Sequence, residues 1–150
     1  MILDILKYPD ERLKQVSTAV SVFDKELHKF LDFMAKTMYE ANGIGLAAPQ
    51  VARFKRFFIV DIAPVDDEER QLMEFINPQI SEGKGKVTFE EGCLSVPGVL
   101  EEVTRKSKIK VNYQDRFGKP QTLVAEDLLA VAIQHETDHL NGILFIEYKI

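Results

Sequence analysis

The sequence predicts an α+β fold in which two main helices are surrounded by antiparallel strands. Two long segments, at 24–42 and 128–140, carry apolar residues at helical spacing. Between them lie short runs of β-branched and aromatic residues, punctuated by glycine, proline and asparagine. No repeat, linker or low-complexity tract interrupts the sequence, so residues 1–150 are expected to form a single α+β domain.

The first long helix is expected to follow a turn at Pro9-Asp10 and the short segment Glu11 to Val16. The carboxylate of Asp24 can cap its first turn, and Gly43 is expected to stop it after about Asn42. The apolar positions that predict its buried face are Leu27, Phe30, Leu31, Met34 and Met38.

Several short strands are predicted in the middle of the chain. Arg53 to Asp61 is predicted to be a buried strand because its second half is β-branched and aromatic, and Pro64 to Arg70 an acidic surface loop. Leu72 to Ile76 is predicted to be a strand that ends at Asn77-Pro78, and a further strand is expected at Lys86 to Phe89.

The last third of the chain predicts a hairpin followed by a helix. Glu101 to Tyr113 and Gln121 to Ala125 are expected to pair across the turn at 115–120. Leu128 to Leu140 is the second long helix, which Asn141-Gly142 should end with a left-handed cap.

Composition excludes several classes of protein. The net charge of −5 comes from 24 acidic and 19 basic residues spread along the chain, so no direct binding of nucleic acid is expected. No apolar run approaches the ~18 residues of a membrane span, and no secretory leader is visible. The single cysteine excludes a disulfide framework and suits a reducing compartment. We therefore expect a soluble, cytoplasmic protein.

The second helix carries the pattern His135-Glu136-Thr137-Asp138-His139. Histidines four residues apart project from one face and can bind one ion, as in the zincin metallohydrolases. Glu136 lies about 100° around the helix, where it can reach a water on the metal without binding the metal itself. The alternative is a polar helix face with two satisfied histidines. The remaining histidine, His28, is expected to be merely solvated.

A hydrolytic metal site needs three protein ligands and one open position. Cys93, in the segment Glu91-Gly92-Cys93-Leu94-Ser95, can supply the third ligand as a thiolate, although an isolated cysteine is often a small buried apolar residue. Gly43 to Gln50 (GIGLAAPQ) offers close backbone approach and the neutral amide of Gln50, but could also be only a helix stop and a loop.

Taken together and in this order, Gly43 to Gln50, Glu91 to Ser95 and Gln134 to His139 resemble the three signature motifs of the peptide deformylases. The likeness extends from Tyr8 to Gly142 and so covers nearly the whole chain. The resemblance implies a metal held by Cys93, His135 and His139. The family's usual ion is Fe²⁺, with Zn²⁺ or Ni²⁺ as substitutes, whereas ligand softness alone would favour zinc.

The resemblance also implies an enzyme of protein biosynthesis that removes the formyl group from the N-terminal formyl-methionine of a nascent polypeptide and releases formate. Water activated by the metal would attack the formyl carbonyl, while Glu136 accepts its proton and passes it to the departing amine. The side-chain amide of Gln50 and the backbone N–H of Leu94 are the expected donors to the carbonyl oxygen.

Substrate contacts are expected from three segments. Leu128, Val131 and Ala132 lie seven, four and three positions before His135 and share its face, so they can line a pocket for the methionine side chain, or simply pack in the core. The peptide is expected to pair as an added strand with main chain near Ile44, Gly45 and Gly92.

Two features depart from the pattern of bacterial family members. Many members have an arginine near the peptide cleft after Pro97, where this chain has Gly98-Val99-Leu100, and the nearest cation is Arg105. The chain also ends at Ile150, eight residues past Gly142, whereas many members continue into a basic helix associated with ribosome docking. Either the sequence is truncated or it is a naturally short form such as some viruses encode, so a transient ribosome contact by that route stays open. The cytoplasm is expected to be that of a bacterium, or of a bacterial host if a virus encodes the chain.

Two other functions remain as alternatives. A metallopeptidase that cuts internal amides also uses HExxH, but such enzymes generally take a later glutamate or histidine as third ligand rather than a preceding cysteine. A structural metal or a domain that only binds peptide N-termini would need a closed fourth position or the loss of Glu136, and neither is seen in the sequence.

Overall fold

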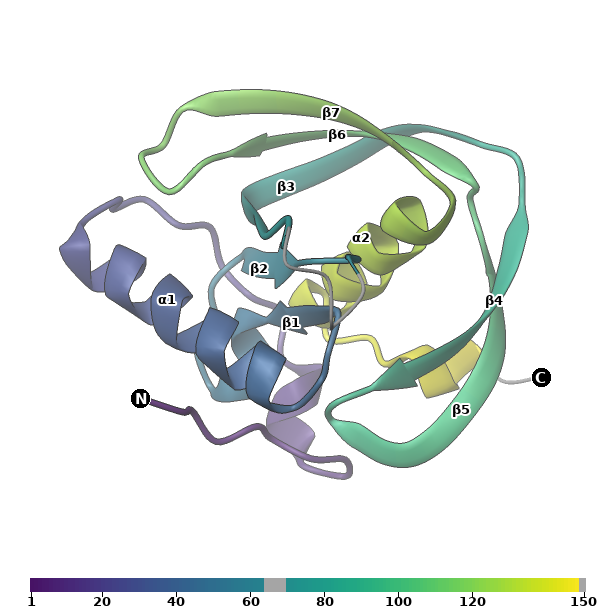
Figure 1. Ribbon diagram of the computed structural model, residues 1–150, viewed down its shortest axis with the longest axis horizontal. Coiled ribbons are helices and arrows are strands. Elements are labelled where there is room, and N and C mark those ends of the chain that lie inside the picture. The colour runs from purple at the N-terminus through teal and green to yellow at the C-terminus, as the bar shows by residue number, and fades with distance from the viewer. Residues whose placement is uncertain (64–69, 149–150) are drawn as a thin grey trace.

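The computed structural model of the chain describes residues 1–63 and 70–148. These residues form a five-stranded antiparallel sheet, a separate two-stranded hairpin and two long helices (Figure 1). The predicted α+β class, with two main helices among antiparallel strands, is confirmed. The predicted acidic loop lies, apart from Arg70, outside the described residues.

Both long helices form where the sequence predicts them. Helix α1 is Lys25–Glu40, and Asp24 Oδ1 accepts a hydrogen bond of 3.0 Å from the backbone N–H of Leu27. It ends slightly before the predicted stop, because Asn42 rather than Gly43 takes the left-handed conformation, with a φ of 57°. Helix α2 is Asp127–Leu140, followed by Gly142 at a φ of 73°. Neither of these nor any other helix of the described chain is long and apolar enough to cross a membrane.

The larger sheet has the strand order β1-β2-β3-β6-β7, and the hairpin consists of β4 and β5. The strands of the sheet are β1 Gly45–Ala47, β2 Phe57–Val60, β3 Met73–Lys84, β6 Lys108–Gln114 and β7 Pro120–Glu126, and those of the hairpin are β4 Val87–Cys93 and β5 Val96–Arg105. Short 3-10 segments lie at η1 Glu11–Lys14, η2 Ala48–Val51 and η3 Phe145–Tyr148.

Strand β2 lies at the centre of the core. Phe58 and Val60 belong to the cluster that packs against α2, whereas Phe57 and Ile59 belong to the cluster that packs against α1. All four side chains are at most 1% exposed, and burying a side chain of this size contributes about 1.5–3 kcal/mol. The predicted buried strand is therefore confirmed, although it is shorter than residues 53–61.

The predicted end of a strand at Asn77-Pro78 is wrong. Strand β3 continues through both residues with a shift of register against β6 between Ile76 and Gln79. Asn77 has a positive φ of 52°, and its side chain replaces a backbone partner by binding both the N–H and the C=O of Val20, at 2.8 and 2.9 Å. A contact 57 residues away in sequence thus compensates for the irregular backbone.

The predicted strand from Glu101 to Tyr113 is in fact two strands. β5 ends at Arg105, β6 begins at Lys108, and the chain changes sheet at the residues between them. The β4–β5 hairpin therefore curves away from the larger sheet towards η3 (Figure 1). The second half of the prediction is confirmed, since β6 pairs with β7 in regular antiparallel register.

His28 is not merely solvated, as was expected. Its Nε2 lies 2.7 Å from the backbone oxygen of Arg116, and its ring meets the ring of Phe117 edge-on. The histidine thus joins α1 to the turn between β6 and β7.

The close approach of Gly142 to the N-terminal segment gives a test of the fold. A side chain at Gly142 would have a strained φ and would also collide with the backbone carbonyl of Lys14, so we expect Gly142→Ala to lower the free energy of unfolding by about 1–3 kcal/mol or more. Gly98 is the matched control, because it has a similar φ of 79° but open space around it. Urea unfolding of both variants should show the larger loss for Gly142→Ala, and equal losses would refute the collision.

Candidate metal centre

Helix α2 places His135, Glu136 and His139 inside the protein. Apolar residues of the helix, which include Ile133 and Leu140, pack on the larger sheet. The helical period places His135 and His139 on one face, one turn apart. His135, Glu136 and His139 are 8%, 5% and 1% exposed, and the two imidazole rings lie 5.0 Å apart between centroids. The predicted helix face therefore exists, and it is buried.

Cys93 meets the two histidines from the end of β4. Its Sγ lies 3.3 Å from His139 Nε2, and one ligand atom from each of Cys93, His135 and His139 lies within 4.8 Å of the others. Two ligands that are each ~2.0–2.3 Å from a tetrahedral ion lie roughly 3.3–3.8 Å apart, so the 3.3 Å between Cys93 Sγ and His139 Nε2 fits two ligands of one zinc-sized or iron-sized divalent ion. The structure thus brings together the three residues predicted as ligands.

The protonation of the two imidazoles differs. Burial alone would lower the pKa of His135, but hydrogen bonds with Cys93 and Glu91 and the nearby charge of Glu136 raise it to about 10. Burial and the neighbouring charge of His135 lower the pKa of His139 well below its usual range. In the metal-free site, one ligand is therefore neutral and the other carries a proton that a metal would displace.

Glu136 lies beside Cys93, His135 and His139, and one of its carboxylate oxygens has no hydrogen-bond partner. Burial raises its pKa to about 7, against the opposing effect of the positive charges of His135 and Arg105. Among the described residues, Glu136 Oε1 and Ser17 Oγ are the buried side-chain atoms without a hydrogen bond. An orphaned carboxylate oxygen next to three ligand atoms is what a site built for a metal and a reacting water would show.

Gly45 makes room for this carboxylate. A methyl group at Gly45 would collide with Glu136 Oε2, so the glycine of β1 is needed for close approach rather than for its backbone conformation. The predicted importance of the glycine loop thus has a specific cause, although Gly45 to Ala47 form strand β1 rather than a loop.

Gln50, from η2, connects the glycine segment to the cysteine segment. Its Oε1 accepts a hydrogen bond of 2.8 Å from the backbone N–H of Ala47. Its Nε2 donates to Ser95 Oγ at 3.0 Å and lies 3.6 Å from Cys93 Sγ. The amide is therefore held in one orientation with its NH₂ group towards the candidate ligands.

A cavity of about 500 Å³ opens beside the site, with walls from α2, β1 and β4. Every residue predicted to contact substrate lines it, namely Ile44, Gly45, Gly92, Leu128, Val131 and Ala132, together with Gln50, Leu94 and Glu136. Val131 and Ala132 are also buried, at 3% and 5% exposure, so this face of the helix both packs in the core and lines the cavity. That the cavity takes the methionine side chain stays a prediction.

Sequence reasoning missed the N-terminal contribution to this cavity. Lys7 lines it, and Lys7 Nζ donates to the backbone oxygen of Leu94 at 3.1 Å. The backbone N–H groups of Leu6 and Tyr8 donate to the oxygens of Gln50 and Ser95, both at 2.7 Å. No sequence signal points to these contacts, because they join residues that are 44 to 87 positions apart.

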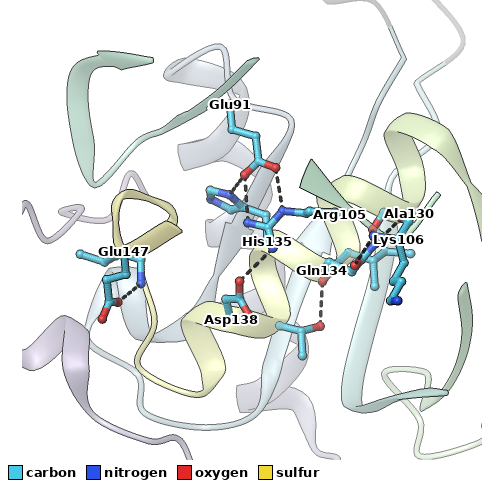
Figure 2. A network of polar contacts seen from close by, with 11 residues as sticks. Glu91, Arg105, Lys106, Ala130, Gln134, His135, Asp138 and Glu147 are labelled. Atoms are coloured by element: carbon cyan, nitrogen blue, oxygen red, sulfur yellow. Dashed lines mark hydrogen bonds and ion pairs between the residues drawn. The ribbon is translucent and has the colours of Figure 1, made fainter. Parts of the chain in front are cut away.

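Sequence reasoning also missed the role of Arg105, which was noted only as the cation nearest in sequence to Gly98-Val99-Leu100, where many family members have an arginine. It is 8% exposed and paired with Glu91 and Asp138, so it does not face the cavity (Figure 2). Burial alone would raise the pKa of Glu91, but hydrogen bonds from His135 and Arg105 lower it overall. Glu91 therefore remains a carboxylate inside the protein.

Comparison with protein families gives one match that covers the chain. The family model described as polypeptide deformylase matches residues 2–149. A peptide deformylase from Chromobacterium violaceum is 54% identical over 146 residues, which are 97% of this chain and 86% of that protein.

Solved structures agree with these matches. A peptide deformylase from Legionella pneumophila superposes with a TM-score of 0.94 at 44% identity, covering 100% of this chain and 87% of the other. One from Synechococcus elongatus, solved in complex with actinonin, gives a TM-score of 0.93 at 45% identity, covering 97% of this chain and 79% of the other. This chain therefore belongs to the peptide deformylase family.

Proposed function

We propose that this chain hydrolyses the formyl group from the N-terminal formyl-methionine of newly made polypeptides and releases formate. The observation that carries the proposal is the group formed by Cys93, His135 and His139 with Glu136 beside it, at the wall of a cavity, in a chain of this family. No observation favours the alternative of a metallopeptidase that cuts internal amide bonds.

The residues present fit a single divalent ion. Cys93, as thiolate, and the imidazoles of His135 and His139 would hold it, and Fe²⁺ is the ion we propose, with Zn²⁺ or Ni²⁺ as substitutes. Such an ion supplies Lewis acidity for the formyl carbonyl and lowers the pKa of the attacking water.

Three groups of the chain would carry out the reaction around that site. Glu136, with its raised pKa of about 7, is suited to take a proton from the attacking water and to return it to the departing amine. The Nε2 of Gln50, which is held by Ser95 near Cys93, and the backbone N–H of Leu94 would stabilise the negative charge on the carbonyl oxygen.

The substrate would bind in the cavity as an extended chain. Strand β1 lies at the edge of the larger sheet, so main chain at Ile44 and Gly45 can pair with a peptide, with Gly92 on the opposite wall. The methionine side chain would enter between Leu128, Val131 and Ala132. Recognition through main chain and one apolar pocket suits an enzyme that processes many nascent sequences.

Nascent polypeptides are the proposed partners, and the cytoplasm, where they are made, is the proposed location. Residues 1–150 would act as one catalytic domain, and any contact with the ribosome would be transient. The charge of −5 is spread over the chain, which supports the absence of direct nucleic-acid binding.

The first test replaces the proposed proton acceptor. Glu136→Gln keeps the size of the side chain but cannot take a proton, so we expect formate release from formyl-Met-Ala-Ser to fall by ~10²–10⁴ in kcat, with the metal retained. Glu126→Gln, an exposed carboxylate just before α2, is the control and should match the wild type.

The same assay tests the reaction. Acetylated and unmodified peptides of the same sequence should not be hydrolysed, and cleavage of their internal amides would support a metallopeptidase instead. A Glu136→Gln protein with full metal content and wild-type formate release would remove Glu136 from the mechanism.

A second test uses the proton held by the metal-free site. The raised pKa of His135 means that its imidazole is charged at pH 7, whereas a coordinating nitrogen must be neutral. We therefore expect Zn²⁺ binding at pH 7 to release at least one proton, and the affinity to rise about tenfold per pH unit for each proton as the pH increases towards 10. Calorimetry in buffers of different ionisation enthalpy measures this number, and a value of zero would contradict the assignment.

A further inference from the structure

Arg105 forms a buried three-way contact between the β4–β5 hairpin and α2 (Figure 2). Its Nε and Nη2 donate to the two carboxylate oxygens of Glu91 at 2.6 and 3.0 Å, and its Nη1 donates to Asp138 Oδ2 at 2.9 Å. The side chains of Arg105 and Glu91 are each 5% exposed, and that of Asp138 is 17% exposed. A bidentate pair of this kind fixes both orientation and distance.

The network continues from Glu91 to a proposed metal ligand. His135 Nδ1–H donates to Glu91 Oε1 at 2.8 Å, which is the same oxygen that accepts from Arg105 Nη2. With Nδ1 engaged in this way, Nε2 is the nitrogen of His135 that is available to a metal. Glu91 therefore fixes the tautomer and the orientation of the ring.

The network also lies close to Cys93 in the β4–β5 hairpin. Glu91 is two residues before Cys93 on β4, and Arg105 is the last residue of β5. A two-stranded hairpin is at best marginally stable by itself, so its position depends on contacts with the rest of the protein. Asp138 and His135, three residues apart on α2, give Arg105 and Glu91 adjacent attachment points on one face of the helix.

We propose that Arg105 and Glu91 are positioning residues of the metal centre. They orient His135 through its Nδ1 and hold the strand that carries Cys93 against α2, so that the thiolate and the imidazoles reach one ion. The proposal rests on the proposed function in one respect, namely that Cys93, His135 and His139 are the ligands. It predicts that weakening the network changes the metal site itself and not only the stability of the fold.

The chain contains a matched control for this comparison. Arg116 donates to the two carboxylate oxygens of Glu74 at 2.9 and 2.7 Å, and also to Asp32 Oδ1 at 2.9 Å. This second cluster joins α1, β3 and the turn after β6, and it includes none of the residues that line the cavity or form the candidate site. It has the same arrangement of one arginine, one glutamate and one aspartate without the link to a metal ligand.

The experiment compares Glu91→Gln and Arg105→Lys with Glu74→Gln. Zn²⁺ affinity is measured by competition with a chelator, and the absorption of the Co²⁺-substituted protein reports the thiolate and the coordination geometry. Urea unfolding of the metal-free proteins measures stability separately. We expect Glu91→Gln and Arg105→Lys to weaken Zn²⁺ binding by ~10–100-fold and to alter the Co²⁺ spectrum. Glu74→Gln should lose stability but keep both the wild-type affinity and the wild-type spectrum.

Three results would overturn the proposal, and they have different meanings. If Glu91→Gln and Arg105→Lys lose stability but keep the wild-type affinity and Co²⁺ spectrum, the network is structural only. If Glu74→Gln changes the metal site as strongly, the effect is not specific to Arg105 and Glu91. If the wild-type protein binds Zn²⁺ without a thiolate band from Co²⁺, the proposed ligand set itself is wrong. If Glu91→Gln does not fold, Asp138→Asn replaces it, with Asp32→Asn as its control.

Discussion

Helix α2 brings ionisable side chains into the interior of the protein, where each of them needs a partner. Residues such as Ile133 and Leu140 pack on the larger sheet, and the same helix also carries His135, Glu136, Asp138 and His139. Burying such groups without partners costs several kcal/mol each, so the rest of the chain must supply counter-charges and hydrogen bonds. The hairpin supplies Cys93, Glu91 and Arg105, and β1 leaves space for Glu136 at Gly45. The contacts of the hairpin and β1 with α2 meet this requirement for all of these groups except Glu136 Oε1.

Much of this fold can be predicted because its signals are local. Helical spacing and the cap at Asp24 define α1, and the aromatic and β-branched run of β2 indicates burial on both faces. The path of β3 through Asn77 could not be predicted, because the bonds that allow it come from Val20, far away in sequence. The break between β5 and β6 depends on which strand pairs with which, and that is a property of the assembled sheets.

The candidate site also contains residues that local sequence signals predict and residues that only the folded chain reveals. His135 and His139 are related by one helical turn, so spacing alone predicts that they share a face. Cys93 and Gln50 were candidates from their chemistry alone, and only the three motifs together favoured them over a buried apolar cysteine and an ordinary loop. The role of Arg105 was not predicted, although it lies two residues after Val103 on β5 and so shares the inward face of the strand, where both are buried. An inward arginine on a strand requires an inward carboxylate, and Glu91 on the paired strand provides it.

The position of β1 at the edge of its sheet exposes the molecule to unwanted pairing with strands of other chains. An edge strand that can pair with the main chain of almost any extended peptide can, by the same chemistry, pair with another copy of itself or with a misfolded neighbour. Here the exposed edge is only Gly45–Ala47, with Leu46 and Ala47 fully buried, and it borders a cavity rather than a flat surface. A short edge of this kind offers little backbone for pairing with a second sheet, which limits aggregation through strand pairing.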